Sequence, residues 1–464
     1  MNIDQLIRFR PIALIISAAI GLSLMAANPV IGQSAPQIVF LDFDTGTDAK
    51  IVYTPLERDA IEAQLERIYR RFDVSFTQTL PSGDFSRITF NVDNDPFFPR
   101  FLLGQPEHID FRNLIRTSSA TVNAEPLGFT GQELISASAN IAAHQLGHLL
   151  GLRDTDSFGP IGAGVLSVDY AENLSPPYTG PTNAMAEAAN HIMAQAGRPG
   201  LPLNLGSAGL RFPPSILEEP NWLSERSSLK LTVAEEEIQT VDDVIGNDTI
   251  GTAQPLELIE LIFPNTIEEG VNAGKGDFCA SVAVVEGSLR GFNDDEDVFE
   301  IHGKAGDILN VEVISNSSVS LAATGIDSTV SVKNQTGTLV ALNDNDNNDA
   351  EPSMFCRSFQ TEAFCTRRDA RIFDLVLPSD GSFFVTVGLS SQIDSGNYEL
   401  FIYRFDGVFL LGDVNFDGQI NFFDIAPFIE ILAARRFRKV ADINQDGFVN
   451  FFDIAPFIEL LQSQ

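Results

Sequence analysis

Two histidines and an aspartate near the middle of the first half of the chain have the spacing of metal ligands. His144 and His148 are four residues apart in the apolar segment AAHQLGHLLGL, so on a helix both imidazoles lie on one face and can bind one ion. Gly151 allows a sharp turn after the helix, which brings Asp154 round as a third ligand. Such a site has three protein ligands and an open position for water. The alternative is that both histidines are ordinary residues of a helix surface or core.

The pattern H-x3-H-x2-G-x2-D resembles the zinc signature of the metzincin peptidases. The resemblance covers residues 36–230 and implies a mixed α/β (α+β) metzincin-like domain, with one Zn2+ bound by His144, His148 and Asp154 and a peptide or protein substrate in the zinc cleft. It also implies that Met193 is the methionine of the turn beneath the metal, although a methionine can equally fill a gap in a core. His191 is a reserve ligand, or a histidine bonded to the backbone.

Gln145 occupies the position at which metzincins carry a glutamate. In the family that glutamate takes a proton from zinc-bound water and passes it to the leaving amine. A glutamine amide can hydrogen-bond the water but cannot accept its proton near neutral pH. Losing a general base typically costs about 10²–10⁴-fold in rate. With Gln145 at the general-base position, hydrolysis is therefore expected to be impaired.

A repeat at the C-terminal end carries oxygen ligands at the positions of a calcium loop. The segment GDVNFDGQINFFDIAPFIEIL at 412–432 recurs as ADINQDGFVNFFDIAPFIELL at 441–461, and in each copy an amphipathic helix follows the loop. Calcium takes about six to eight oxygens, supplied from loop positions 1, 3, 5, 7, 9 and 12. These positions hold Asp413, Asn415, Asp417, Gln419, Asn421 and Asp424 in the first loop and Asp442, Asn444, Asp446, Phe448, Asn450 and Asp453 in the second. The two loops predict two bound Ca2+ ions.

Aspartate at position 12, and a first loop with no helix before it, resemble the type I dockerin domain, here at 411–464. The resemblance implies a small α-helical calcium-loop module that docks onto a cohesin-like or other extracellular protein. Partner recognition in the family uses loop positions 10 and 11, which are Phe422, Phe423, Phe451 and Phe452 in this chain. Dockerins with known cohesin partners usually carry small hydroxyl residues there, so the class of partner stays open. The four phenylalanines form either the core of the module or an exposed patch.

The elements that must position the histidines follow from the spacing of apolar residues. We expect strands over 37–43, 74–76 and 88–92, and helices over 55–72 and 131–150. Thr130 is the expected N-cap of the second helix and Gly151 its end, which places both histidines near the C-terminal end of the helix.

Residues 236–406 change to short alternating runs separated by turn residues, which predicts an all-β sandwich of jelly-roll-like type. The turns at 304–307, 335–337 and 378–381 are each expected to join two strands into a hairpin. The runs DEDVFEIHGKAGDILNVEV and PSDGSFFVTV resemble the pre-peptidase C-terminal domain of secreted peptidases. The acidic run 343–349 is a further candidate for calcium, or an unbound polar loop.

Charge and the N-terminal segment bear on partners and location. The 29 Lys and Arg against 63 Asp and Glu give a net charge of -34, which argues against nucleic acid because its phosphates would be repelled. Arg8 and Arg10 precede an apolar run and then small residues, so 1–35 is predicted to be a signal peptide, with a retained membrane anchor as the alternative. After cleavage no membrane span is expected, and the protein is predicted to be secreted, extracellular or at the cell surface.

The three cysteines bear on the same compartment. In an oxidising environment Cys356 and Cys365 can close a short loop and leave Cys279 unpaired, or Cys279 can bridge to one of them.

Together these features predict a multidomain, secreted, metzincin-like zinc metalloendopeptidase scaffold whose peptidase activity is weak or lost, with a calcium-dependent docking module. One alternative is a non-catalytic extracellular adhesion or assembly protein. A second is a component of a polysaccharide-degrading complex, but no paired carboxylates of a glycosidase stand out in the sequence.

Overall fold

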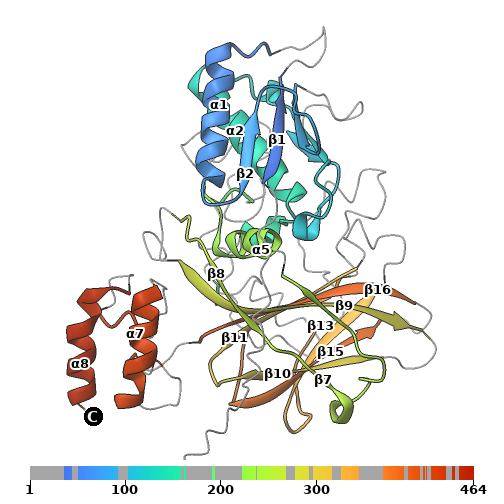
Figure 1. Ribbon diagram of the computed structural model, residues 1–464. Helices are drawn as coiled ribbons and strands as arrows, with labels where there is room; N and C mark the ends of the chain where they lie inside the picture. The colour runs from blue at the N-terminus through green and yellow to red at the C-terminus, as the bar shows by residue number, and fades with distance from the viewer. Residues whose placement is uncertain are drawn as a thin grey trace, which may run out of the picture.

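The computed structural model describes three sheet-rich and helical regions in the order predicted from the sequence: a mixed sheet with helices, a two-sheet body and a small C-terminal helical region (Figure 1). The described residues are 36–43, 51–91, 103–157, 161–162, 191–193, 222–236, 238–267, 277–291, 296–315, 326–343, 369–390, 395–407, 411–412, 414, 420–434, 441–444 and 449–463. The predicted signal peptide, most of the acidic run at 343–349, and Cys356 and Cys365 lie outside these residues, so those expectations remain predictions.

The first domain begins with the elements that periodicity predicts. Strand β1 (Gln37–Asp42) is followed by helix α1 (Pro55–Tyr69) and strands β2 (Val74–Thr77) and β3 (Ser86–Phe90). Helix α1 starts at Thr54, whose side chain accepts the Glu57 amide N–H while the Glu57 carboxylate accepts the Thr54 amide N–H. This reciprocal cap satisfies two amide groups that a helix start otherwise leaves without partners.

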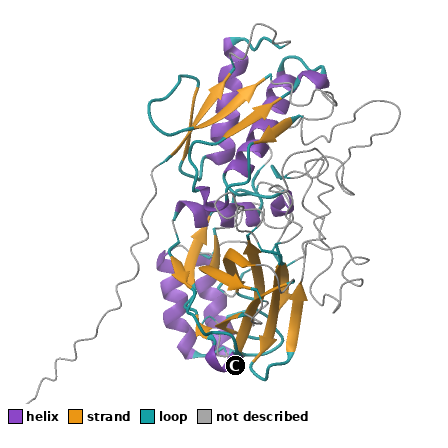
Figure 2. Ribbon diagram, turned by 90° about the vertical axis from the view of Figure 1, so that its right-hand side faces the viewer, coloured by secondary structure: helices purple, strands orange, loops and turns teal. Residues whose placement is uncertain are grey.

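The sheet of this domain has the order β2-β1-β3-β5-β4, which adds strands β5 (Ser119–Val122) and β4 (Gly104–Pro106) that were not predicted. All neighbours are parallel except β4, which runs antiparallel to β5 at the edge. Alternate residues of β1, β3 and β5 point into one hydrophobic core shared with α1 and α2. Both helices therefore cover the same face of the sheet, as Figures 1 and 2 show.

Helix α2 (Gln132–Leu149) carries both histidines and is buried along most of its length. Its N-cap is Gly131 with no side-chain hydrogen bond, so the prediction of Thr130 as the cap was wrong. Gly151 follows the helix with φ +93°, and a Cβ there would lie 2.8 Å from the Asp110 carbonyl oxygen. Glycine at 151 is therefore required both by the backbone conformation and by the close approach of Asp110.

The second region consists of two sheets with a common apolar core. One sheet has the order β13-β12-β15-β10-β7, the other β14-β11-β16-β9-β6 with β8 also paired to β9. The strands are β6 (Thr240–Asp242), β7 (Gln254–Pro255), β8 (Ile259–Phe263), β9 (Phe278–Arg290), β10 (Asp297–Gly303), β11 (Ile308–Ile314), β12 (Ser328–Asn334), β13 (Leu339–Asn343), β14 (Arg371–Val376), β15 (Gly381–Leu389) and β16 (Ser395–Phe405).

Only one of the three predicted hairpins forms. Strands β12 and β13 pair across the turn at 335–337, as expected. The turns at 304–307 and 378–381 instead carry the chain from one sheet to the other, because β10 and β15 belong to one sheet and β11 and β14 to the other. Strands next to each other in sequence need not pair in a two-sheet body, since its core requires apolar faces from both layers.

Helix α5 (Glu225–Glu235) lies between the first domain and the two-sheet body in both ribbon views. Leu229 and Val233 join Phe111 of the first domain and Phe401 and Tyr403 of β16 in one apolar cluster. The cluster covers the outer face of the sheet that contains β11 and β16. The two regions therefore share a hydrophobic interface as well as the chain connection.

The C-terminal region pairs two short helices, α7 (Ile425–Ala434) and α8 (Ile454–Gln462), each preceded by one 3-10 turn. Phe428 and Phe457 stack with ring centroids 4.3 Å apart in a small core that includes Val414 and Ile443. No helix in the described part of the chain is long and apolar enough to cross a membrane.

Candidate metal centre and docking surface

His144 and His148 lie on consecutive turns of α2 and face each other. Their Nε2 atoms are 3.1 Å apart, and their rings meet edge to face with centroids 4.7 Å apart. Two nitrogens bound to one tetrahedral zinc, at Zn–N distances of about 2.0–2.1 Å, would lie about 3.3–3.4 Å from each other. The separation in this structure is close to that of two ligands of one ion.

The other nitrogen of each ring is held by a backbone carbonyl. Nδ1 of His144 lies 2.9 Å from the Ile192 oxygen, and Nδ1 of His148 lies 2.9 Å from the Leu152 oxygen. A carbonyl oxygen can only accept, so Nδ1 carries the proton in both rings. This is the arrangement by which proteins usually orient metal-binding histidines.

Both imidazoles are neutral near pH 7. Burial lowers the pKa of His148 to about 3, aided by neighbouring His144 and opposed by the Leu152 carbonyl. Burial also lowers the pKa of His144, opposed by the Ile192 carbonyl. With Nδ1 protonated, Nε2 of each neutral ring carries the lone pair that can bind a metal. Two such nitrogens 3.1 Å apart can bind one ion, so the donor pair fits a zinc ion.

Met193 lies against the same turn of α2. It is fully buried, and a Cβ at Gly147 would collide with its sulfur and lie 3.3 Å from its terminal methyl carbon. The preceding residue, Ile192, supplies the carbonyl that orients His144 and donates its own amide to Trp222. His191 is buried and its Nδ1 donates to the Ser157 carbonyl, which agrees with the backbone-bonded alternative for this residue.

Gln145 is buried and extends toward the edge strand β4. A Cβ at Gly104 would lie 2.8 Å from its Cγ, and its Oε1 has no hydrogen-bond partner among the described residues. The side chain thus lies on the β4 side of the histidine pair. The Gln145 amide can donate a hydrogen bond to a bound molecule or accept one from it. Unlike a carboxylate, it cannot take up a proton from that molecule.

Asp154 begins a 3-10 turn (Asp154–Ser157), and its side chain is outside the described residues. Within the part of the chain that is described, no three His, Cys, Asp or Glu side chains gather into one possible metal site. The structure therefore brings together two of the three residues of the predicted zinc site, and Asp154 remains a prediction as the third.

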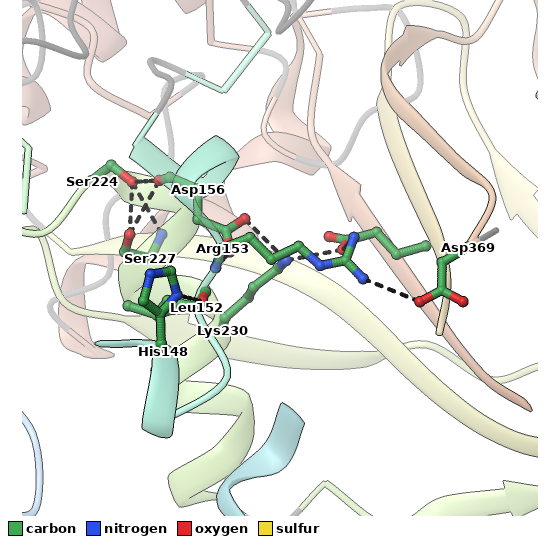
Figure 3. A network of polar contacts seen from close by, with 9 residues as sticks. His148, Leu152, Arg153, Asp156, Ser224, Ser227, Lys230 and Asp369 are labelled. Atoms are coloured by element: carbon green, nitrogen blue, oxygen red, sulfur yellow. Dashed lines mark hydrogen bonds and ion pairs between the residues drawn. The ribbon is translucent and has the colours of Figure 1, made fainter. Parts of the chain in front are cut away.

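The residues after the motif form a buried polar network that sequence reasoning missed (Figure 3). Arg153 is only 1% exposed and lies between Glu312 of β11 and Asp369, while Lys230 of α5 contacts Asp156 and Glu312. One signal was available in the sequence, because Glu312 is a single charge within the apolar strand ILNVEVI. Burial opposes ionisation of Glu312, but Lys230, Arg153 and Arg371 outweigh it and hold the pKa of that carboxyl below its usual value.

The calcium-loop positions that the structure describes lie at the start of the two C-terminal helices. Asp424 and Asp453 are fully buried, and each accepts the amide N–H of the asparagine at position 9, Asn421 or Asn450, at 2.7 and 2.9 Å. Asp453 also accepts the Asn444 amide at 3.1 Å. Buried carboxylates at position 12 of both loops fit the role of calcium ligands. The remaining predicted ligands at 413, 415, 417, 419, 446 and 448 are outside the described residues.

The four phenylalanines at loop positions 10 and 11 are exposed, which decides between core and patch. Their exposed fractions are 71% for Phe422, 67% for Phe423, 68% for Phe451 and 65% for Phe452. Ile425, Ile429, Ile454 and Ile458, on the helices that follow, are also among the exposed apolar side chains. We call these eight residues the aromatic patch. The repeat gives the patch two equivalent halves.

Comparisons with known proteins identify the C-terminal region. Residues 411–461 match the family model of the Dockerin type I domain. No curated protein matches the chain.

Three solved structures are similar to parts of the chain. A periplasmic lysozyme inhibitor, PliG of Aeromonas hydrophila, is 12% identical, covers 35% of this chain and 99% of its own, with a TM-score of 0.19. The pre-peptidase C-terminal domain of a Bacillus anthracis collagenase is 15% identical, with coverages of 26% and 87% and a TM-score of 0.17. High choriolytic enzyme 1, a hatching enzyme zinc-protease from Oryzias latipes, is 13% identical, with coverages of 44% and 90% and a TM-score of 0.21. These scores are too low to support a conclusion about this chain.

Proposed function

We propose that this chain is a secreted protein that binds zinc and a peptide in a peptidase-type first domain and docks onto an extracellular partner through its dockerin domain. The observation that carries the first part is the pair of Nε2 atoms 3.1 Å apart, with both Nδ1 atoms bonded to carbonyls. Two imidazoles oriented in this way, with their Nε2 atoms close together, are a donor set for a transition metal.

His144 and His148 would hold the metal, with Asp154 as the third protein ligand. When bound, zinc acidifies a coordinated water and polarises a carbonyl group. Gln145 can hydrogen-bond a water or a peptide beside the histidines, but it cannot store the proton that hydrolysis releases. Peptide binding with weak or absent cleavage is therefore the function that this set of residues supports best.

Metal analysis together with a protease assay tests this proposal. We expect about one zinc per purified chain beyond any background, lost in His148→Ala. Gln145→Glu should raise the cleavage of casein or gelatin by up to about 10²–10⁴-fold, because it restores the base. The double variant that combines His144→Ala with Gln145→Glu is the matched control, and it should show no gain. Purified protein that holds no zinc, or zinc content unchanged in His148→Ala, would refute the metal site.

A non-catalytic adhesion or assembly protein is the second candidate, and burial of an uncharged Gln145 at the catalytic position favours it. A peptide hydroxamate separates the two. If the metal site exists, hydroxamate at 100 times its Kd should stabilise the zinc-loaded protein by about 2.7 kcal/mol. A scaffold without a metal site should show no shift of Tm.

For the C-terminal region we propose calcium-dependent docking. Dockerin domains bind calcium and cohesins, and they occur in extracellular cellulosome components, which supports an extracellular site of action. The aromatic patch is the proposed contact surface. Its partner would present an apolar surface, whereas the usual cohesin partner binds small hydroxyl side chains at these positions.

Binding of the full chain to a panel of cohesins, with calcium and with chelator, tests the proposal. Binding that persists in chelator would contradict it. A place in a polysaccharide-degrading complex would follow if a cohesin of such a complex binds.

A further inference from the structure

Arg153, the residue between Leu152 and Asp154, points away from the histidines and into the interface with the two-sheet body. Its guanidinium carbon lies 4.7 Å from the ring centre of Phe111. Nη1 lies 3.9 Å from Glu312 and Nη2 lies 3.6 Å from Asp369 (Figure 3). Both carboxylates belong to the two-sheet body and are almost fully buried. The chain immediately after the first two proposed ligands is therefore held from the other domain.

Lys230 of α5 links the Glu312 carboxylate to the loop that contains Arg153 and Asp156. Its Nζ lies 2.9 Å from both Glu312 and Asp156, and the Asp156 carboxylate accepts the Arg153 amide N–H at 2.7 Å. Two cations thus alternate with three carboxylates from three segments of the chain. A buried cluster of this kind is stable only while every member keeps its partner, so it resists small displacements of the loop.

The loop that this network holds also carries the partner of His148. The Leu152 carbonyl accepts the His148 Nδ1–H at 2.9 Å, and the Leu152 amide donates to Gly147 at 2.9 Å. Leu152 and Arg153 share a peptide bond, so a shift of the Arg153 backbone moves the oxygen that sets the orientation of His148. The same shift moves Asp154 on the other side.

We infer that Glu312 and Asp369 of the two-sheet body are positioning residues for the metal site of the first domain, acting through Arg153 on the Leu152 carbonyl and the Asp154 backbone. The expected effect on zinc affinity rests on the proposed metal site. The expected effect on the orientation of His148 does not require a metal.

The interface also contains a buried ion pair outside the chain of contacts that runs from Asp369 through Arg153, Glu312 and Lys230 to Asp156. Arg226 of α5 bonds Asp374 of β14, with both side chains buried, and the Arg226 charge also interacts with that of Asp156. Asp374 has φ +51°, a conformation that asparagine tolerates. Asp374→Asn is therefore a matched control, since it removes one buried carboxylate from the same interface and leaves Arg153 in place.

The experiment compares Glu312→Gln, Asp369→Asn and Asp374→Asn in the full chain with two measurements. In metal-free protein, NMR of the imidazole N–H region follows the His148 Nδ1–H, which we expect to weaken or shift in the first two variants and to remain in the control. In competition with a chromogenic chelator, the first two should bind Zn2+ about 10-fold to 100-fold more weakly than wild type, as is typical when outer-shell partners are removed, and the control within about twofold.

The outcomes are distinct. If all three variants leave the His148 signal unchanged, or all three weaken it equally, the positioning role is refuted. If wild type binds no zinc but the His148 signal responds selectively, the metal site fails and the positioning of His148 holds. Should Glu312→Gln not fold, Arg153→Lys keeps the charge, shortens the reach to both carboxylates, and is expected to give the same selective change in milder form.

Discussion

Gln145 packs against Gly104 with no room for a side chain at residue 104. A Cβ there would lie 2.8 Å from Gln145 Cγ and 2.7 Å from the Thr121 carbonyl oxygen. The edge strand β4 thus packs directly against Gln145 of α2.

Gly104→Ala should destabilise the protein by about 1–3 kcal/mol, because the new methyl group forces apart β4, β5 and the Gln145 side chain. Chemical denaturation at constant pH measures the change. Gly251→Ala is the control, since its nearest atom is 3.8 Å away and residue 251 is exposed, and we expect a change within about 0.5 kcal/mol. Equal effects of the two substitutions would show that the fit between Gln145 and Gly104 is loose.

Glu235, at the end of α5, should make stability depend on pH. Burial raises its pKa to about 7, opposed by a hydrogen bond from the Asp73 amide and aided by the charges of Asp73 and Glu236. Between about pH 4.5 and 7 the folded state holds a proton that the unfolded state has lost, so the free energy of unfolding should fall as pH rises through this window. The upper limit of the change is about 3 kcal/mol.

Glu235→Gln should remove this part of the pH dependence. Urea denaturation of wild type and variant at pH 4.5, 5.5, 6.5 and 7.5 gives the measurement, and the difference between the two proteins should grow in favour of the variant toward high pH. A constant difference across the series would contradict the assignment to Glu235.

The aromatic patch should contribute to binding and not to stability. Phe422→Ser and Phe451→Ser, alone and together, should leave the free energy of unfolding of the dockerin domain within about 0.5 kcal/mol of wild type, because both rings are exposed. The core control Phe428→Ala should cost about 3–5 kcal/mol. In the serine variants, calcium-dependent capture by a partner should weaken, as should self-association measured by light scattering. If the variants instead lose stability and keep binding, the rings belong to the core of the module and the prediction is wrong.

Calcium removal should unfold residues 411–464 and leave the rest of the chain folded. Without a cation the buried carboxylates of Asp424 and Asp453 lose the charge that balances them, which destabilises both helix starts. Calorimetry of the full chain with calcium and with chelator should show one transition that disappears and one that is unchanged. Asp453→Ala should reproduce the chelator trace in the presence of calcium, and identical traces for wild type under both conditions would overturn the prediction.

The sequence predicted the elements whose apolar residues follow a regular spacing. Helix α1 and strand β3 fall within a few residues of the expected bounds because each buries one face only, and β1 does so because it is a short, almost continuous apolar run. Strand β4 was missed because its three residues, GQP, have no apolar period at all, and it is defined by its neighbour β5. Helix α5 was missed because it has no apolar face that alternates with a polar one. Both of its faces are covered, and its polar ERSSLK segment is buried because its charged side chains form ion pairs.

In the candidate metal centre too, the features set by local spacing could be predicted and those set by the packing of distant segments could not. The facing of His144 and His148 follows from helical spacing and could be predicted. The carbonyl of Ile192 and the support of Arg153 could not, since both depend on how distant segments pack on α2. The wrong hairpins at 304–307 and 378–381 have a related cause, because alternation fixes which face of a strand is apolar and does not fix which sheet the strand joins.

The apolar cluster beneath α5 determines where this chain can be cut. Leu229 and Val233 are inserted between Phe111 and the β16 side chains, so a truncation at residue 236 would leave an uncovered hydrophobic surface on one fragment and remove the support of the Arg153 loop from the other. A cut between Gly407 and Leu411 crosses neither the cluster nor the ion pairs. Expression trials should therefore treat residues 36–407 as one inseparable piece, and domain exchange within such proteins should succeed at the dockerin boundary and fail at the boundary between the first two regions.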